Sequence, residues 1–229
     1  DPFELRMLQL NPMTGIIVGY QRALLDGLPP DWPMLGYSAG VALLAIALVV
    51  LAALVAAGAL RQTDRALLDL VQSVRTTWLD VFASAVSIVG QAEVTAGLAL
   101  GLAVARWRRR LDTWTVPLLL AVVTAVEVAL KLTVPQPPPP DELSRSIELV
   151  PFVHAPFPGA FPSGHVARTA FLVGIARVPA WIALTVVALM MVTRVYLADH
   201  WPADVLGGLL LGLLVAQGAA VAERRLRRH

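Results

Sequence analysis

The sequence contains no cysteine and little charge, since only 15% of its 229 residues are Asp, Glu, Lys or Arg. The absence of cysteine excludes disulfides, thiolate catalysis and cysteine-ligated metal sites. Soluble domains carry about 25% charged residues, so this chain has too few charged side chains to cover a water-soluble protein of its size. Hydrophobic residues make up 57% of the sequence instead.

Long uncharged stretches indicate that the hydrophobic residues form membrane-spanning segments. Residues 32–60 carry no charge, and an apolar run of about 20 residues is enough to cross a bilayer. We expect an all-α integral membrane protein, a six-transmembrane-helix bundle with an N-terminal amphipathic or reentrant segment. An interfacial helix should precede the second span, and the proline-rich segment 135–162 should form a loop. The expected spans are 35–60, 91–105, 114–134, one that starts at Ser163, 181–198 and 204–222.

The basic residues predict how the chain sits in the membrane. Placing "RWRRR" (106–110), Arg177 and the C-terminal "RRLRR" on one side gathers nine basic residues there. The positive-inside rule makes that side, with the C-terminus, cytoplasmic. These charges lie at segment ends rather than across one soluble face, which argues against nucleic-acid binding. Arginine is 17 of the 18 basic residues, as in GC-rich genomes, so we expect a multi-pass protein of a bacterial plasma (inner) membrane.

Several polar side chains lie within or at the ends of the expected spans. A charged residue in mid-bilayer costs at least about 2.5 kcal/mol, so such residues are usually paired or line a functional site. The six-span topology puts a set of them at the same outward or periplasmic ends. We interpret this gathering as a candidate site made of Lys131, Ser163, His165, Arg194, His200 and Asp204.

The residue types in this set indicate phosphate chemistry. "PSGH" (162–165) opens a helix at Ser163 and Gly164, where free backbone N–H groups attract an anion. Lys131 and Arg194 add cationic donors that suit phosphate oxygens. His165 and His200 can transfer protons or attack as nucleophiles near neutral pH. We therefore predict a phosphoryl-transfer site with no metal and no cofactor.

The spacing of "HWPAD" (200–204) adds an orienting acid to this site. His200 and Asp204 are four residues apart, one helical turn, so the carboxylate can hold the imidazole in one tautomer. Pro202 suits the first turn of the helix that begins there.

Lys131, "PSGH" and "TRVYLADHWPAD" (193–204) resemble the three motifs of the type 2 phosphatidic acid phosphatase superfamily. That superfamily includes lipid phosphate phosphatases, bacterial polyprenyl-diphosphate phosphatases and the vanadium haloperoxidases. The resemblance covers roughly residues 62–222, and it implies a lipid phosphatase domain over residues 61–229. In the membrane members the fold is a six-helix bundle with its site at the outer face.

The resemblance also implies roles for the site residues. His200 would be the nucleophile that forms a phosphohistidine, and Asp204 would orient it. His165 would protonate the leaving oxygen and then activate the water that releases phosphate. The phosphoryl oxygens would be held by Lys131, Ser163, Gly164 and Arg194.

Two positions depart from the family pattern. Thr193 stands where serine is usual, which keeps the hydroxyl. The first motif has lysine, six residues and then Arg-Pro, whereas Lys131 is followed at that spacing by Pro138 and Pro139. One phosphate-binding arginine is missing, and Arg168 or Arg145 are candidates to replace its charge. The alternatives are a solvated Arg145 in the loop and an Arg168 that pairs with an acid such as Glu127.

Residues 1–60 predict an N-terminal amphipathic segment plus the first transmembrane helix. This stretch, with its "NP" dipeptide at 11–12 and Tyr20-Gln21, resembles the tail of a polysaccharide-type ABC exporter permease. The resemblance implies ABC exporter subunits as partners and a fusion with the phosphatase domain. An ordinary amphipathic lead-in to a first span fits the same residues.

The sequence thus predicts a membrane phosphatase whose substrate is a lipid phosphate or diphosphate, with polyprenyl diphosphate favoured and a phosphatidic-acid-type lipid next. Three alternatives remain: a vanadate-binding haloperoxidase, a component of a polysaccharide exporter with a weak or inactive site, and a lipid-phosphate-binding protein without turnover. The complete set of His165, His200 and Asp204 argues against the last, because binding alone does not need it.

Overall fold

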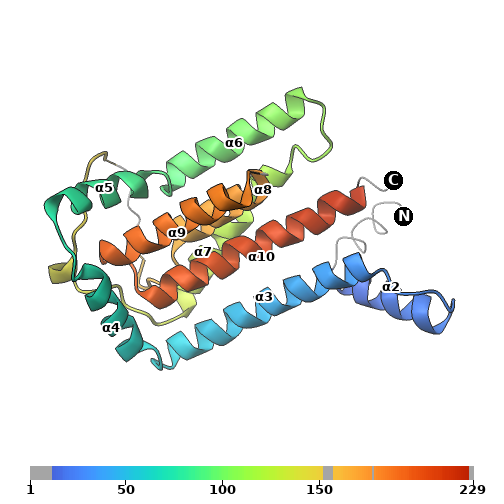
Figure 1. The fold of residues 1–229 in the computed structure, drawn as a ribbon, viewed down its shortest axis with the longest axis horizontal. Coiled ribbons are helices and arrows are strands. Elements are labelled where there is room, and N and C mark those ends of the chain that lie inside the picture. Colours follow the sequence, from blue (N-terminus) through green and yellow to red (C-terminus); the bar gives the residue numbers. More distant parts are fainter. Residues whose placement is uncertain (1–11, 152–156, 177, 227–229) are drawn as a thin grey trace.

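The computed structural model describes residues 12–151, 157–176 and 178–226, and within these ranges every regular element is helical (Figure 1). Arg177, residues 1–11 and residues 227–229 lie outside the described residues, so the predictions that involve them are not addressed. The α-helices are α2 (Pro12–Leu24), α3 (Trp32–Ala56), α4 (Arg61–Gln72), α5 (Thr77–Ile88), α6 (Ala92–Arg108), α7 (Leu120–Thr133), α8 (Gly164–Ala176), α9 (Ala180–Tyr196) and α10 (Pro202–Leu226). Short 3₁₀ helices occupy Val116–Leu119 (η1) and Asp141–Leu143 (η2).

Three helical segments of the described chain are long and apolar enough to cross a membrane: Trp32–Ala56, Val116–Thr133 and Pro202–Ala220. The pair α5 and α6 is bent by 43° and passes the same test as one broken span, which makes up to four. Helices α8 and α9 are apolar but shorter. The all-helical membrane class is confirmed, whereas the count of six spans stays a prediction.

The predicted single interfacial helix before α6 is wrong, because the structure divides that stretch into α4 and α5. The break falls at residues 73–76, where Thr76 adopts an extended conformation and its side chain accepts a hydrogen bond from Leu79 N at 3.4 Å. Such an N-cap starts a new helix. The buried residues of α4 are Asp64, Leu68 and Gln72, whereas neighbouring Leu67 is 42% exposed.

Helix α10 runs the length of the bundle between α8 and α3 (Figure 1). Gly208 and Gly212 permit the close approach of α10 to α8, since a Cβ at either position would collide with the carbonyl oxygen of Ser163 or Ala167. Phe161 and Phe171 are fully buried in the core beside this contact. The close packing fixes the start of α8 against the start of α10, where the candidate site residues lie.

The first span belongs to the same core as the rest of the bundle. Leu48 and Val55 of α3 are buried in one cluster with Leu211 and Ala216 of α10. Helix α2 packs against α3 and lies at the end of the bundle opposite α4 (Figure 1). The division of the chain into residues 1–60 and 61–229 therefore stays a prediction that this packing does not require.

Candidate active site

The alternating course of the helices brings four helix ends together. Lys131 lies in the last turn of α7, α8 begins at Gly164, Arg194 lies in the last turn of α9, and α10 begins at Pro202. His165 lies within electrostatic range of Lys131, Arg168, Arg194 and His200. The residues predicted from the sequence thus gather at one end of the bundle.

The predicted contact between His200 and Asp204 is present at the start of α10. Nδ1 of His200 lies 3.5 Å from Oδ2 of Asp204, and the Asp204 side chain is fully buried. Oδ2 also accepts a hydrogen bond of 2.9 Å from Trp201 N. The histidine contact is long for a hydrogen bond, as catalytic contacts often are before substrate binds. Because Nδ1 faces the Asp204 carboxylate, Nε2 is the ring nitrogen that does not face it.

A turn that contains one residue in the left-handed conformation positions His200 beside Asp204. Helix α9 ends at Tyr196, and Ala198 adopts a φ of 54°, a conformation that usually costs a residue with a Cβ about 1 kcal/mol or more. The N–H groups of Asp199 and His200 then both donate to the Arg194 carbonyl, at 3.2 and 3.3 Å. These two hydrogen bonds fix the backbone of His200 relative to the backbone of Arg194.

The start of α8 is tied to the start of α10. Ser163 N donates to the Asp204 carbonyl at 2.8 Å, and the Ser163 side chain is completely buried. Asp64 of α4 supports the same corner, since its Oδ1 accepts a hydrogen bond from Ala203 N at 2.8 Å. These contacts hold "PSGH" and "HWPAD" against each other.

Unpartnered polar atoms mark this region. Nine buried side-chain N and O atoms of the described residues make no hydrogen bond, and six of them belong to predicted site residues. Buried polar atoms are normally paired, so a concentration of exceptions calls for an explanation such as a ligand site. The six atoms are Ser163 Oγ, His165 Nε2, Arg168 Nε, Arg194 Nε, His200 Nδ1 and Asp204 Oδ1.

A buried carboxylate links two of the cations. Glu127 Oε1 lies 3.1 Å from Lys131 Nζ, and Oε2 lies 2.6 Å from Arg168 Nη1. The carboxylate also lies directly against Gly164, where a Cβ would collide with it. Arg168 further donates to the Gly90 carbonyl at 3.2 Å. The sequence interpretation that Arg168 pairs with Glu127 is therefore confirmed.

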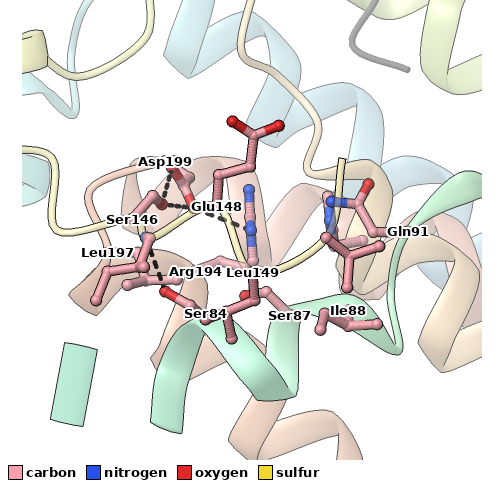
Figure 2. Close-up of a pocket in the computed structure, with 13 residues that line it drawn as sticks. Ser84, Ser87, Ile88, Gln91, Ser146, Glu148, Leu149, Arg194, Leu197 and Asp199 are labelled. Carbon is pink, nitrogen blue, oxygen red and sulfur yellow. Dashed lines mark hydrogen bonds and ion pairs between the residues drawn. The ribbon is translucent and has the colours of Figure 1, made fainter. Parts of the chain in front are cut away.

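The third cation also has an internal partner. Arg194 Nη1 lies 2.9 Å from Asp199 Oδ2, and Ser146 Oγ donates to the same carboxylate at 2.7 and 2.8 Å (Figure 2). The proline-rich loop is thereby attached beside the arginine. Thr193, the departure in the third motif, donates its hydroxyl to the Met190 carbonyl at 3.0 Å and contributes to the helix rather than to the site.

Arg145 is a partly exposed loop residue that forms an ion pair with Asp80. Its guanidinium contacts both carboxylate oxygens of Asp80, at 3.2 and 2.6 Å, and Tyr196 OH donates to Asp80 at 2.7 Å. The Asp80 carboxylate raises the pKa of Arg145 above its ordinary value. The solvated-loop interpretation holds only in part, because the Arg145 side chain is 32% exposed but ion-paired, and it anchors the loop to Asp80 on α5, which also accepts from Tyr196 on α9.

A cavity of about 320 Å³ opens beside His165 and Arg194. Ser84, Ser87 and Ile88 line it from α5, and Gln91 follows that helix (Figure 2). The opposite wall is the loop segment 146–150, which is attached to α5 through a 3.0 Å hydrogen bond from Ile147 N to Ser84 Oγ. Its volume suits a small-molecule ligand.

The electrostatics of the site favour a neutral His200. Burial, together with the positive charges of Arg194 and Lys131, lowers the pKa of His200 well below the ordinary histidine value. His200 lies in the turn between α9 and α10 and is 7% exposed. At neutral pH its imidazole is therefore uncharged and keeps a lone pair on one ring nitrogen, as a nucleophile requires.

Sequence reasoning missed two groups of residues in this region. Asp199 directly precedes His200, and a carboxylate within "YLADHW" was a local signal that it contacts the site. Ser84, Ser87 and Gln91 recur at a spacing of three and four in an apolar stretch of sequence, which is the periodicity of one helical face. That face was readable from the sequence, but its position beside His165 was not.

The comparisons with known proteins agree with this arrangement. The PAP2 superfamily model matches residues 112–228. A crystal structure of a transmembrane PAP2-type phosphatidylglycerolphosphate phosphatase from Bacillus subtilis is similar, with 23% identity, a TM-score of 0.63, and coverage of 82% of this chain and 98% of that one. The crystal structure of LpxE from Aquifex aeolicus has 24% identity and a TM-score of 0.52, over 67% of this chain and 92% of that one.

No curated protein matches the chain, and the matches above do not support the resemblance of residues 1–60 to an exporter permease. At these identities the two crystal structures establish the shared helical fold. The family match extends over more than half of the chain and contains Lys131 and the two later motifs. The chain belongs to the PAP2 superfamily.

Proposed function

We propose that this protein is a membrane phosphatase that hydrolyses a lipid phosphate or diphosphate at the outer membrane face through a phosphohistidine intermediate. Family membership supports lipid phosphate hydrolysis. The observation that carries the proposal is the group of six unpartnered polar atoms around His165 and His200. A phosphoryl group has three oxygens that accept hydrogen bonds, so it suits the guanidinium and hydroxyl donors of this group.

In the first step, Nε2 of His200 attacks phosphorus and a P–N bond forms while the P–O bond to the lipid alcohol breaks. The carboxylate of Asp204 holds Nδ1 and stabilises the positive charge that develops on the ring. Protonated His165 gives its proton to the leaving oxygen, so the lipid departs as a neutral alcohol.

In the second step, His165 takes a proton from water as the water oxygen attacks phosphorus. The P–N bond breaks, inorganic phosphate leaves, and His200 returns to its neutral form. Charge on the transferred group is stabilised throughout by the cations and by the N–H groups at the start of α8. In this proposal Lys131, Ser163, Gly164 and Arg194 hold the phosphoryl oxygens.

Arg168 is proposed to supply the charge of the missing motif arginine. It lies one turn after His165 on α8, and its Nε has no partner in the described structure. Its ion pair with Glu127 uses Nη1, so the pairing leaves Nε available to a phosphate. Arg145 is not proposed for this role, because its guanidinium is occupied by Asp80.

The walls of the cavity support a lipid substrate. The exposed loop side chains Ile147, Leu149 and Val150 line one side, while Ser84, Ser87 and Gln91 line the other. An amphipathic ligand with its tail in the bilayer and its phosphate at Arg194 satisfies both walls. Polyprenyl diphosphate and phosphatidic-acid-type lipids are the two candidate substrates, as the sequence predicts.

The test is phosphate release by the detergent-purified protein from polyprenyl diphosphate, phosphatidate and phosphatidylglycerol phosphate in the presence of a chelator. We expect release that His200→Ala lowers by about 10³-fold or more, the size of effect seen when a nucleophile is removed. His229→Ala is the control and should keep full activity. Folded protein that releases phosphate from none of these lipids contradicts the proposal and favours an exporter-linked binding role.

A further inference from the structure

We infer that the polar face of α5 is a subsite for the leaving group, selective for a lipid monophosphate whose alcohol carries a free hydroxyl beside the phosphoester. The inference rests on the proposed function, because it places the phosphate at Arg194. It assigns substrate choice to residues outside the family match, which begins at residue 112.

The central observation is Ser87. Its side chain is 5% exposed, it lines the cavity that also contains His165 and Arg194, and its Oγ has no hydrogen-bond partner in the described structure. A buried hydroxyl without a partner destabilises the protein. A ligand group that donates to or accepts from this hydroxyl removes that destabilisation, whereas an apolar lipid segment leaves it in place.

Two neighbours extend Ser87 into a polar face. Ser84 lies one turn earlier on α5, Gln91 lies in the connection between α5 and α6, and both line the same cavity. Figure 2 shows the two serines along α5, with Arg194 between them and Glu148 in this view. The Ser84 hydroxyl accepts from Ile147 N and keeps its own proton for donation. The three side chains offer neutral donors and acceptors.

The backbone places this face close to the chemistry. Gly90 ends the turn after α5, and a Cβ there would lie 2.8 Å from the His165 ring. The Gly90 carbonyl also accepts from Arg168. The end of α5 is thus in contact with the proposed general acid, so groups bonded to the leaving oxygen come within reach of Ser87.

The charges around the cavity disfavour a second phosphate there. Among its described lining residues, Arg194 is the one arginine or lysine, and Asp199 already pairs with it at 2.9 Å. Asp199 and Glu148 add two carboxylates to the same lining. Neutral hydroxyls fit beside these carboxylates, whereas a second phosphate adds like charge. The cavity therefore selects a hydroxylated monophosphate over a diphosphate.

The experiment compares two substrates that differ by one hydroxyl. Phosphatidylglycerol phosphate carries a hydroxyl on the carbon next to the phosphoester, and an analogue built on 1,3-propanediol lacks it. We expect the protein to prefer the first in kcat/KM by about five-fold or more, as the loss of a neutral hydrogen bond predicts. Ser87→Ala and Gln91→Ala should bring this ratio towards one, and farnesyl diphosphate should be the poorest substrate.

Ser38→Ala is the matched control. Ser38 is also buried and its Oγ also lacks a partner, but it lies on α3 and does not line the cavity. This variant should keep the ratio. A ratio near one in the unmodified protein, a ratio that Ser87→Ala leaves unchanged, or a preference for the diphosphate overturns the inference.

Binding separates this inference from the proposed function. If no lipid is hydrolysed, the proposed function fails. The rise in the melting temperature of the protein with each of the two lipids still shows which lipid binds more tightly. Greater stabilisation by the hydroxylated lipid, lost in Ser87→Ala, supports the subsite without turnover. Equal stabilisation by both lipids overturns it.

Discussion

At the scale of single residues, the site consists of cations that are already paired. Lys131 and Arg168 share Glu127, and Arg194 pairs with Asp199. A buried cation without a partner is costly, so these carboxylates hold the cations in place before a phosphate arrives. A bound phosphate then either contacts these cations in addition to their carboxylates or replaces the carboxylates. Phosphate binding by Arg168 and its ion pair with Glu127 are therefore two roles that can be tested separately.

A double replacement separates these two roles of Arg168. Glu127→Gln leaves two buried cations without their carboxylate and should destabilise the protein by about 3–5 kcal/mol. Adding Arg168→Met removes one of those cations and should restore part of that stability. If Arg168 also holds phosphate, KM in the double variant should stay about ten-fold above that of the unmodified protein.

Thermal unfolding in detergent and steady-state kinetics on one lipid substrate measure the two effects. A double variant that regains both stability and the original KM contradicts a phosphate-binding role for Arg168. It would leave the ion pair as the whole function of this arginine.

At the scale of helices, the contact between α8 and α10 sets the distance between the two histidines. Gly208 and Gly212 bring α10 against the backbone of α8, and the hydrogen bond from Ser163 N to the Asp204 carbonyl closes the same contact. His165 and Asp204 lie at the two helix starts that this packing brings together. Separation of the helices therefore acts on catalysis as well as on stability.

Gly212→Ala tests this coupling. The new Cβ would collide with the Ala167 carbonyl oxygen, so the helices must shift, at a cost of about 1–3 kcal/mol. We expect kcat to fall about ten-fold or more, because small misplacements of catalytic groups are expensive. Gly218→Ala on the same helix has open space around it and should raise stability by about 0.5–1 kcal/mol. Similar kinetics for the two variants would contradict the coupling.

The sequence predicted the parts of the site that depend on local spacing. His200 and Asp204 are four residues apart, so they meet at the start of α10 although His200 precedes the helix, and "PSGH" marks a helix start by its residue types. The pairing of Glu127 with Arg168 was among the interpretations, since both are charged residues within spans. The break between α4 and α5 was missed because no proline or glycine marks it in "SVRTTW" (73–78). The cavity wall on α5 was missed because its contact with His165 is made only in the tertiary fold.

At the scale of the whole molecule, the chain is a helical membrane protein with its candidate site at one end of the bundle. Large apolar side chains such as Leu43, Ile46 and Val49 are exposed on α3, as a lipid-facing surface requires. Arg106, in the last turn of α6, donates to the Ile175 carbonyl near the end of α8, so this basic segment lies at the opposite end of α8 from His165. Which end faces outward is a prediction from the arginine distribution.

Single cysteines test this orientation, because the chain contains no cysteine of its own. Glu142 and Asp112 are both exposed and lie in η2 and in the connection between α6 and η1. A membrane-impermeant maleimide should label Glu142→Cys in intact spheroplasts and Asp112→Cys only after permeabilisation. The reverse pattern would place the site on the cytoplasmic side.

Trapping of the covalent intermediate tests the proposed phosphohistidine mechanism directly. Protein mixed with a lipid substrate labelled with ³²P at the scissile phosphate is quenched in alkali and digested. We expect an acid-labile, alkali-stable label on the peptide that contains His200, lost in His200→Ala and kept in His229→Ala. Rapid phosphate release with no label on that peptide, or a label that survives His200→Ala, would contradict it.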